Sequence, residues 1–191
     1  MGREPWPENY IPPSTPAEAD VARLESLLAD ARDEVPLQGV LADCPVLLRG
    51  LIPSSADAWY FPKPPLGNQF VPDFLLCHRN SLGFNWTLVE LESPTAPILT
   101  RAGVIAAKLN DAQRQVRDWR IWLRDNIAYA RGELGFAQID AECPSVIIIG
   151  RRHAIGRGNV QRYRELSDSR DRVMTYDRFV EAALLPRVLQ E

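Results

Sequence analysis

A run of four apolar residues, Val146-Ile147-Ile148-Ile149, most narrowly limits what this chain can fold into. An uninterrupted apolar run of this length is typical of a strand that is covered on both faces of its sheet. It predicts a central strand over residues 143–150. A long amphipathic helix is predicted over residues 103–130, where apolar residues recur at steps of three and four. The residues of this stripe are Leu109, Ala112, Val116, Trp119 and Leu123.

Shorter elements are predicted from changes of hydrophobic period and from turn residues. The other predicted helices cover residues 17–31, 36–41, 45–51, 160–166 and 177–189. The other predicted strands cover residues 58–61, 70–78, 85–91 and 173–175. A turn at 79–83 joins the strands over 70–78 and 85–91 into an antiparallel hairpin. Pro72 predicts that the strand over 70–78 lies at an edge or has a bulge near its start. The fold class is therefore α/β, with a central mixed sheet flanked by helices.

The chain has 191 residues, which fits one domain with a sizeable core. Residues 1–16 contain five prolines and no periodicity, so we expect a proline-rich N-terminal arm followed by a single domain over 17–191. No apolar run approaches the roughly 18 residues that a membrane span needs, so no membrane partner is expected. Three widely separated cysteines indicate neither a zinc site nor a disulfide framework, which favours a cytoplasmic location.

The charge is unevenly distributed, although the net charge is only −3. Residues 101–131 contain seven bases and three acids, and residues 151–172 contain seven arginines and three acids. Arginine accounts for 20 of the 22 bases, and its forked guanidinium suits phosphate contacts. The alternative is that these segments are ordinary solvated helix faces.

Three carboxylates fall on the predicted hairpin. Asp73 and Glu90 are 17 positions apart, which places them on adjacent strands, and Glu90 and Glu92 point to one side of their strand. Acids on an apolar strand are costly unless they are solvated, paired or bound to a cation. Mg²⁺ takes oxygen ligands and can lower the pKa of a bound water. We therefore predict a Mg²⁺ site, with Mn²⁺ as a possible substitute, on Asp73, Glu90 and the backbone carbonyl of Leu91.

Five blocks in this order resemble the DUF4263 family, the nuclease domain of Shedu antiphage-defence proteins in the PD-(D/E)XK phosphodiesterase superfamily. The resemblance covers about residues 34–185. The blocks are Phe70-Val71-Pro72-Asp73-Phe74, Leu88-Val89-Glu90-Leu91-Glu92-Ser93-Pro94, Ala112 with Gln115 and Trp119, Ile148-Ile149-Gly150-Arg151-Arg152, and Thr175-Tyr176-Asp177.

The resemblance implies a restriction-endonuclease-like core, a metal-dependent DNA endonuclease activity in antiphage defence, and a homo-oligomer. It implies catalytic roles for Asp73, Glu90, Glu92 and Gln115, with Gln115 positioning the attacking water, and Glu34 is a further candidate. One position departs from the superfamily pattern, because Glu92 stands where a lysine is usual. Glu92 then acts as an extra metal ligand or a general base. The alternatives are an impaired nuclease fold that binds DNA or partner subunits, and an interaction module with surface acids.

A basic loop follows the central strand and is predicted to contact DNA phosphates. The predicted DNA-binding residues are Arg151, Arg152, His153, Lys108 and Arg114. The alternative is a turn whose arginines pair with acids elsewhere in the fold. The glycines around Arg157 do not match a dinucleotide fingerprint, so no nucleotide cofactor is expected.

Overall fold

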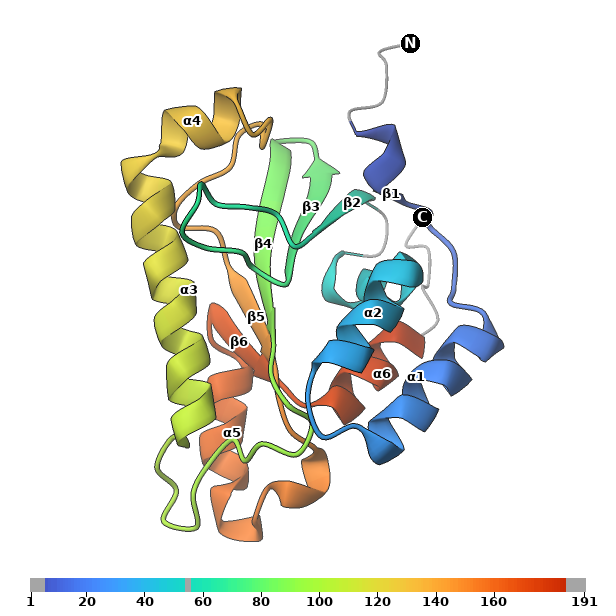
Figure 1. Cartoon of the computed structure of the whole chain (residues 1–191). Helices are drawn as coiled ribbons and strands as arrows, with labels where there is room; N and C mark the ends of the chain where they lie inside the picture. Colours follow the sequence, from blue (N-terminus) through green and yellow to red (C-terminus); the bar gives the residue numbers. More distant parts are fainter. Residues whose placement is uncertain (1–5, 54–55, 185–191) are drawn as a thin grey trace.

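The computed structural model describes residues 6–53 and 56–184 and is built around one mixed sheet (Figure 1). Its strands are β1 (Tyr10–Ile11), β2 (Asp57–Pro62), β3 (Phe74–Asn80), β4 (Gly83–Leu91), β5 (Ser145–Ile148) and β6 (Asp171–Met174), and they follow this order across the sheet. The first four strands are antiparallel neighbours, whereas β4, β5 and β6 are parallel. The predicted mixed α/β fold is confirmed.

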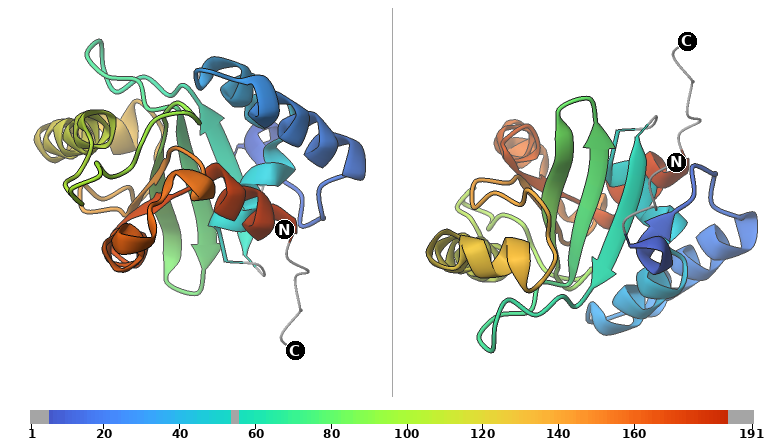
Figure 2. Two further views of the ribbon diagram at one scale, coloured as in Figure 1. Left: turned by 90° about the horizontal axis from the view of Figure 1, so that it is seen from below. Right: turned by 90° about the horizontal axis from the view of Figure 1, so that it is seen from above.

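Helices cover both faces of the sheet (Figures 1 and 2). One face carries α1 (Glu18–Asp30), α2 (Val35–Asp43), the 3-10 helix η2 (Pro45–Leu51) and α6 (Tyr176–Leu184). The other face carries α3 (Ala107–Asp125), α4 (Ile127–Gly132) and α5 (Val160–Ser167). Short 3-10 turns η1 (Pro7–Asn9), η3 (Arg152–Ala154) and η4 (Arg157–Asn159) complete the described elements. None of the described helices is long and apolar enough to cross a membrane.

Strand β5 lies between β4 and the edge strand β6, so it is interior but not central, and both of its faces are covered, as its apolar run predicts. Val146 and Ile148 lie in the apolar core under α1, α2 and α6, whereas Ile147 and Ile149 lie in the core under α3. Because both faces of this strand are buried, a polar side chain within the apolar run would be buried whichever way it pointed.

The predicted helix over 103–130 is divided in the structure and starts later. Ala106 donates its backbone N–H to the carbonyl of Ile98, which holds the preceding residues in a loop. At the other end Asn126 leaves the helical conformation, with φ −124° and ψ 26°, and its side chain donates to the carbonyl of Trp122. An asparagine side chain that hydrogen-bonds to nearby backbone in this way can end a helix. The apolar periodicity of the sequence continues past this residue, so it does not reveal the break.

Two further boundaries differ from the prediction. Strand β3 begins at Phe74, because Phe70 pairs with Leu66 in an isolated bridge and Pro72 has no N–H for a ladder. The predicted helix over 45–51 has 3-10 geometry. Beyond residue 184, the predicted closing helix lies outside the described residues.

The sequence predicts that the proline-rich segment is a separate arm, but residues 6–11 of it pack against the sheet. Tyr10 and Ile11 form an edge strand that pairs with β2, and Ile11 is fully buried. Trp6 packs edge-on against Trp59 and Phe61 at centroid distances of 5.9 and 5.5 Å. The aromatic partners are supplied by the sheet, so the segment's own sequence does not reveal this contact.

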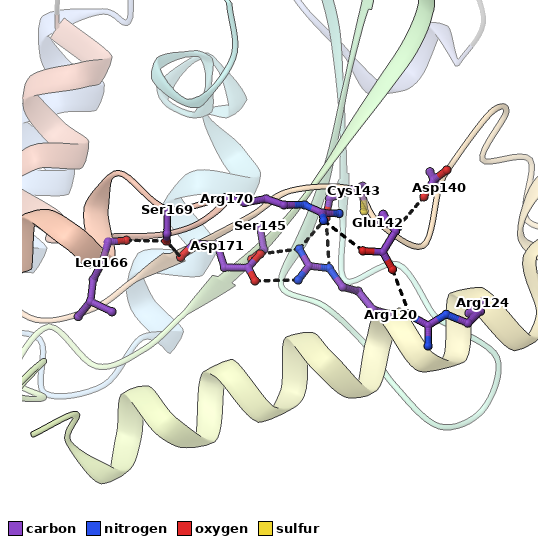
Figure 3. Close-up of polar contacts among 10 residues, drawn as sticks. All are labelled: Arg120, Arg124, Asp140, Glu142, Cys143, Ser145, Leu166, Ser169, Arg170 and Asp171. Carbon is purple, nitrogen blue, oxygen red and sulfur yellow. Dashed lines mark hydrogen bonds and ion pairs between the residues drawn. The ribbon is translucent and has the colours of Figure 1, made fainter.

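Helix α3 is fastened to the sheet by Arg120 (Figure 3). Its guanidinium binds both carboxylate oxygens of Asp171, at 2.8 and 2.5 Å, and donates to the carbonyl of Cys143 at 2.7 Å. Ser145 also donates to Asp171. These contacts lower the pKa of Asp171, chiefly through the hydrogen bond from Arg120 and against the opposing effect of burial.

We expect Arg120→Ala to lower the free energy of unfolding by about 2–3 kcal/mol, because the half-buried carboxylate of Asp171 loses its charged, forked donor and the Cys143 carbonyl loses its guanidinium donor. The matched control is Arg124→Ala, whose partner Glu142 is exposed, and it should leave the unfolding midpoint almost unchanged. Chemical denaturation at pH 7 measures both. Since the folded pKa of Asp171 lies below its ordinary 3.8, the contribution is present above that pH and is lost as the pH falls below it.

Candidate active site

Three carboxylates meet at the carboxyl end of β4, beside the start of β3. Asp73 directly precedes β3, where Phe74 pairs with Val89 of β4. The Oδ2 atom of Asp73 accepts the backbone N–H of Leu91 at 2.7 Å, and a hydrogen bond joins Asp73 and Glu90. Asp73, Glu90 and Glu92 are only 6%, 7% and 4% exposed. The structure therefore brings together the three acids that the sequence places on this hairpin.

The Leu91 carbonyl faces the same side of β4 as the Leu91 N–H, because both groups of one strand residue point the same way. That side carries Asp73. No group of three or more His, Cys, Asp or Glu side chains in the described ranges is arranged to hold a metal ion. Mg²⁺ usually takes only one or two carboxylates and completes its shell with water and phosphate. Asp73, Glu90 and the Leu91 carbonyl fit that smaller donor set.

Burial and like charge act together on these acids. Burial, followed by the charges of Asp73 and Glu92, raises the pKa of Glu90 to about 9. Burial also raises the pKa of Glu92, where the charge of Lys108 opposes it and that of Glu34 adds to it. Glu90 therefore holds a proton at neutral pH, which relieves the repulsion between the buried acids.

The two lysines of the whole chain both contact this cluster. Lys63 Nζ lies 2.6 Å from Asp73 Oδ1, and Lys108 Nζ lies 3.6 Å from Glu92 Oε2. Lys63 has a positive φ of 48°, which is uncommon for a residue with a side chain. Its backbone N–H also donates to the Asp73 carbonyl at 2.9 Å. The carboxylates are therefore flanked by one lysine from the end of β2 and one from the start of α3.

Two further residues support the cluster from the opposite face of the sheet. Gln38 on α2 donates to Asp73 Oδ1 at 2.6 Å. Tyr176 at the start of α6 is fully buried and donates its hydroxyl to the Glu92 carbonyl at 2.9 Å. Burial, together with the nearby carboxylates, raises the pKa of Tyr176 well above its ordinary value, so it stays a donor.

Sequence reasoning missed Lys63 and Gln38. A signal for Lys63 was available, because a lysine is rare in this arginine-rich chain and here it follows a strand adjacent to the acids. Gln38 had no comparable signal, since it occupies an ordinary position on a short helix. Glu34 lies close enough to affect the pKa of Glu92, in line with its status as a further candidate.

Gln115 is half-buried on α3, seven residues after Lys108. Its side chain forms no hydrogen bond to another described residue, so its role at the attacking water stays a prediction.

The predicted phosphate-binding residues do not form one group, because most of them pair with different acids. Arg151 is largely occupied, because it binds Asp177 at 2.9 Å and the carbonyl of Leu28. Arg152 pairs with Glu181, and Arg114 pairs with Asp111. His153 is exposed, and Lys108 lies at Glu92. Contact of these residues with DNA stays a prediction, but the ion pair of Arg151 favours a structural role for that residue.

A family model described as Shedu protein SduA, C-terminal, matches residues 31–180. The chain belongs to this Shedu family. The match spans every element that positions the carboxylates, from α2 to α6, and it confirms the resemblance drawn from the sequence blocks. Shedu proteins act in antiphage defence, and that association extends to this chain at the level of the family. No curated protein is significantly similar to this Shedu domain.

We expect the metal-free protein to lose stability as the pH rises from about 5 to 9. The folded pKa of Glu90 lies above its ordinary 4.5, so its contribution is complete below that pH and is lost as the pH rises through about 9. Glu90→Gln should flatten this decline. Glu165→Gln, an exposed change, should not. Thermal unfolding in chelator across this pH range measures the effect.

Added Mg²⁺ should raise the unfolding temperature of the wild type more at pH 8.5 than at pH 6, because the ion competes with the proton on Glu90. Glu90→Gln should lose this pH-dependent gain. Equal gains in the two proteins would contradict metal binding by Glu90.

Proposed function

We propose that this Shedu domain is a metal-dependent DNA endonuclease with a PD-(D/E)XK core, and that it hydrolyses phosphodiester bonds in antiphage defence. The observation that carries the proposal is the buried pair Asp73–Glu90, held beside a backbone carbonyl and a lysine. Two buried acids in contact repel each other, and a divalent cation relieves that repulsion as a proton does, so the pair supports a cation site.

Asp73, Glu90 and the Leu91 carbonyl would hold the Mg²⁺ or Mn²⁺. When bound, such an ion stabilises charge on the phosphate oxygens and lowers the pKa of a bound water. Asp73 is oriented for this task by the N–H of Leu91 and by Gln38, which fix both of its carboxylate oxygens. A ligand fixed by second partners in this way binds metal more tightly than a free carboxylate.

Glu92 would serve as a base rather than as a ligand. Burial raises the pKa of Glu92 above its ordinary value, which makes it a better proton acceptor, and Lys108 Nζ lies 3.6 Å from its Oε2 atom. Gln115 would position the attacking water from α3. Lys63 and Lys108 would supply the positive charge that Glu92 removes from the superfamily pattern, and they act from neighbouring elements.

A second function has specific support. Lys63 Nζ forms an ion pair with Asp73 Oδ1, and Lys108 forms one with Glu92. Because the protein's own lysines already neutralise these carboxylates, the site has less need of a metal ion. This favours an impaired nuclease fold that binds DNA or partner subunits and does not cleave.

Cleavage of linear and supercoiled DNA decides between the two functions. We expect the purified domain to cleave with Mg²⁺ or Mn²⁺ and not with chelator. Glu90→Ala and Asp73→Asn should each lower the rate by more than about a hundredfold, the upper end for loss of a group that only supports a metal ligand. Glu165→Gln is the control. Cleavage by Glu90→Ala at the wild-type rate would contradict the proposal, and DNA binding without cleavage under any metal would favour the impaired fold.

Lys63→Met should lower the cleavage rate between about tenfold and a hundredfold, because it removes a cation from Asp73 while leaving the ligands in place. Lys63→Arg should retain part of the rate. A Lys63→Met protein as active as wild type would show that the charge is supplied elsewhere.

A further inference from the structure

A cavity of about 450 Å³ lies between α5, α6 and the turn η3, outside the carboxylate cluster. Apolar and aromatic side chains form one part of its wall, and arginines form another. Its lining residues are Arg152, Ile155, Val160, Tyr163, Arg164, Arg178 and Glu181. Cavities of this size accommodate small-molecule groups rather than a single ion.

The charge of the cavity is positive. Glu181 is its one lining acid and pairs with Arg152 at 2.5 Å. Arg164 and Arg178 form no ion pair with any other described residue. Arg172, on the adjacent strand, has its pKa lowered by burial and by the charge of Arg178, which shows that positive charge accumulates here. Two guanidinium groups without an acidic partner beside an enclosed surface favour an anion with forked oxygens, such as a phosphate.

The apolar wall has a fixed aromatic ring. Tyr163 is half-buried, and its hydroxyl accepts the backbone N–H of Thr175 at 3.3 Å. Ile155 and Val160 lie on the same cavity wall. A held aromatic ring beside cations is the combination that binds an unstacked base together with its phosphate.

The cavity shares an edge of the sheet with the carboxylate cluster. Thr175 contacts Tyr163, and the next residue, Tyr176, donates to the Glu92 carbonyl. Strand β6 is two positions from β4, which is about 10 Å at ~4.8 Å per strand.

We propose that the cavity binds one unpaired nucleotide of a DNA strand that also reaches the carboxylate cluster. Arg164 and Arg178 hold its phosphate, and Tyr163 stacks on its base. This inference rests on the proposed function and adds a substrate preference to it, because a fully paired duplex has no free base to place in the cavity.

The test is DNA binding in chelator, where no cleavage occurs. A fluorescent 20-nucleotide single strand and a blunt duplex of the same sequence are titrated at several salt concentrations. We expect Arg164→Ala with Arg178→Ala to reduce the salt slope for the single strand by about 0.7, since the double variant loses the contact with one phosphate. The matched control is Arg157→Ala with Arg162→Ala, two exposed arginines outside the lining, and it should leave the slope at the wild-type value.

The base contact has its own variants. Tyr163→Leu should weaken single-strand binding about tenfold, whereas Tyr163→Phe, which keeps the ring, should not. Circular dichroism and the unfolding midpoint show whether Tyr163→Leu remains folded. If it does not, the Arg164 and Arg178 variants alone decide.

Several results would overturn the proposal. The first is an unchanged salt slope in the Arg164 and Arg178 double variant, and the second is an equal loss of slope for the blunt duplex. The third is a wild-type protein that binds no DNA. The fourth is displacement of the labelled strand by free thymidine monophosphate at a concentration equal to that of the strand. The last result would assign the cavity to a free nucleotide. Binding as expected without cleavage in Mg²⁺ would support the cavity and reject the hydrolytic function, so the two failures are distinguishable.

Discussion

The carboxylate of Asp73 is the contact on which the candidate site depends. One oxygen accepts the N–H of Leu91, and the other accepts both Gln38 and Lys63. These partners come from β4, from α2 and from the end of β2, so a single buried side chain joins three separate parts of the fold. Because such a group is expensive to bury without partners, its network also fixes where Glu90 and the Leu91 carbonyl lie.

Charge balance is the second property of this site. Two lysines approach the acids from opposite sides, and a buried glutamate retains its proton in the absence of a cation. Under the proposed function, a divalent ion would bind here by displacing the proton of Glu90. Under the proposed function, these two lysines supply the positive charge that Glu92 lacks.

The proposed active site and the proposed nucleotide cavity both lie at the carboxyl edge of the parallel strands. Tyr176 and Thr175 connect the carboxylate cluster on one side with the arginine-lined cavity on the other. The arginine that the loop sequence most clearly suggested, Arg151, is engaged by Asp177, whereas Arg164 and Arg178 remain available to an anion. A count of bases along the chain cannot make this distinction, because it contains no information about which of them meet an acid.

Local sequence determined much of this protein. The apolar run of β5, the hairpin of β3 and β4, and the two-residue spacing of Glu90 and Glu92 follow from side-chain alternation, which a strand imposes on its own residues. The ordered blocks also identified the Shedu family. Only the tertiary structure decided that Trp6 and Ile11 join the sheet, that Lys63 and Gln38 meet Asp73, and that Arg151 is paired. Those contacts join residues distant along the chain, and their geometry depends on packing that no local pattern records.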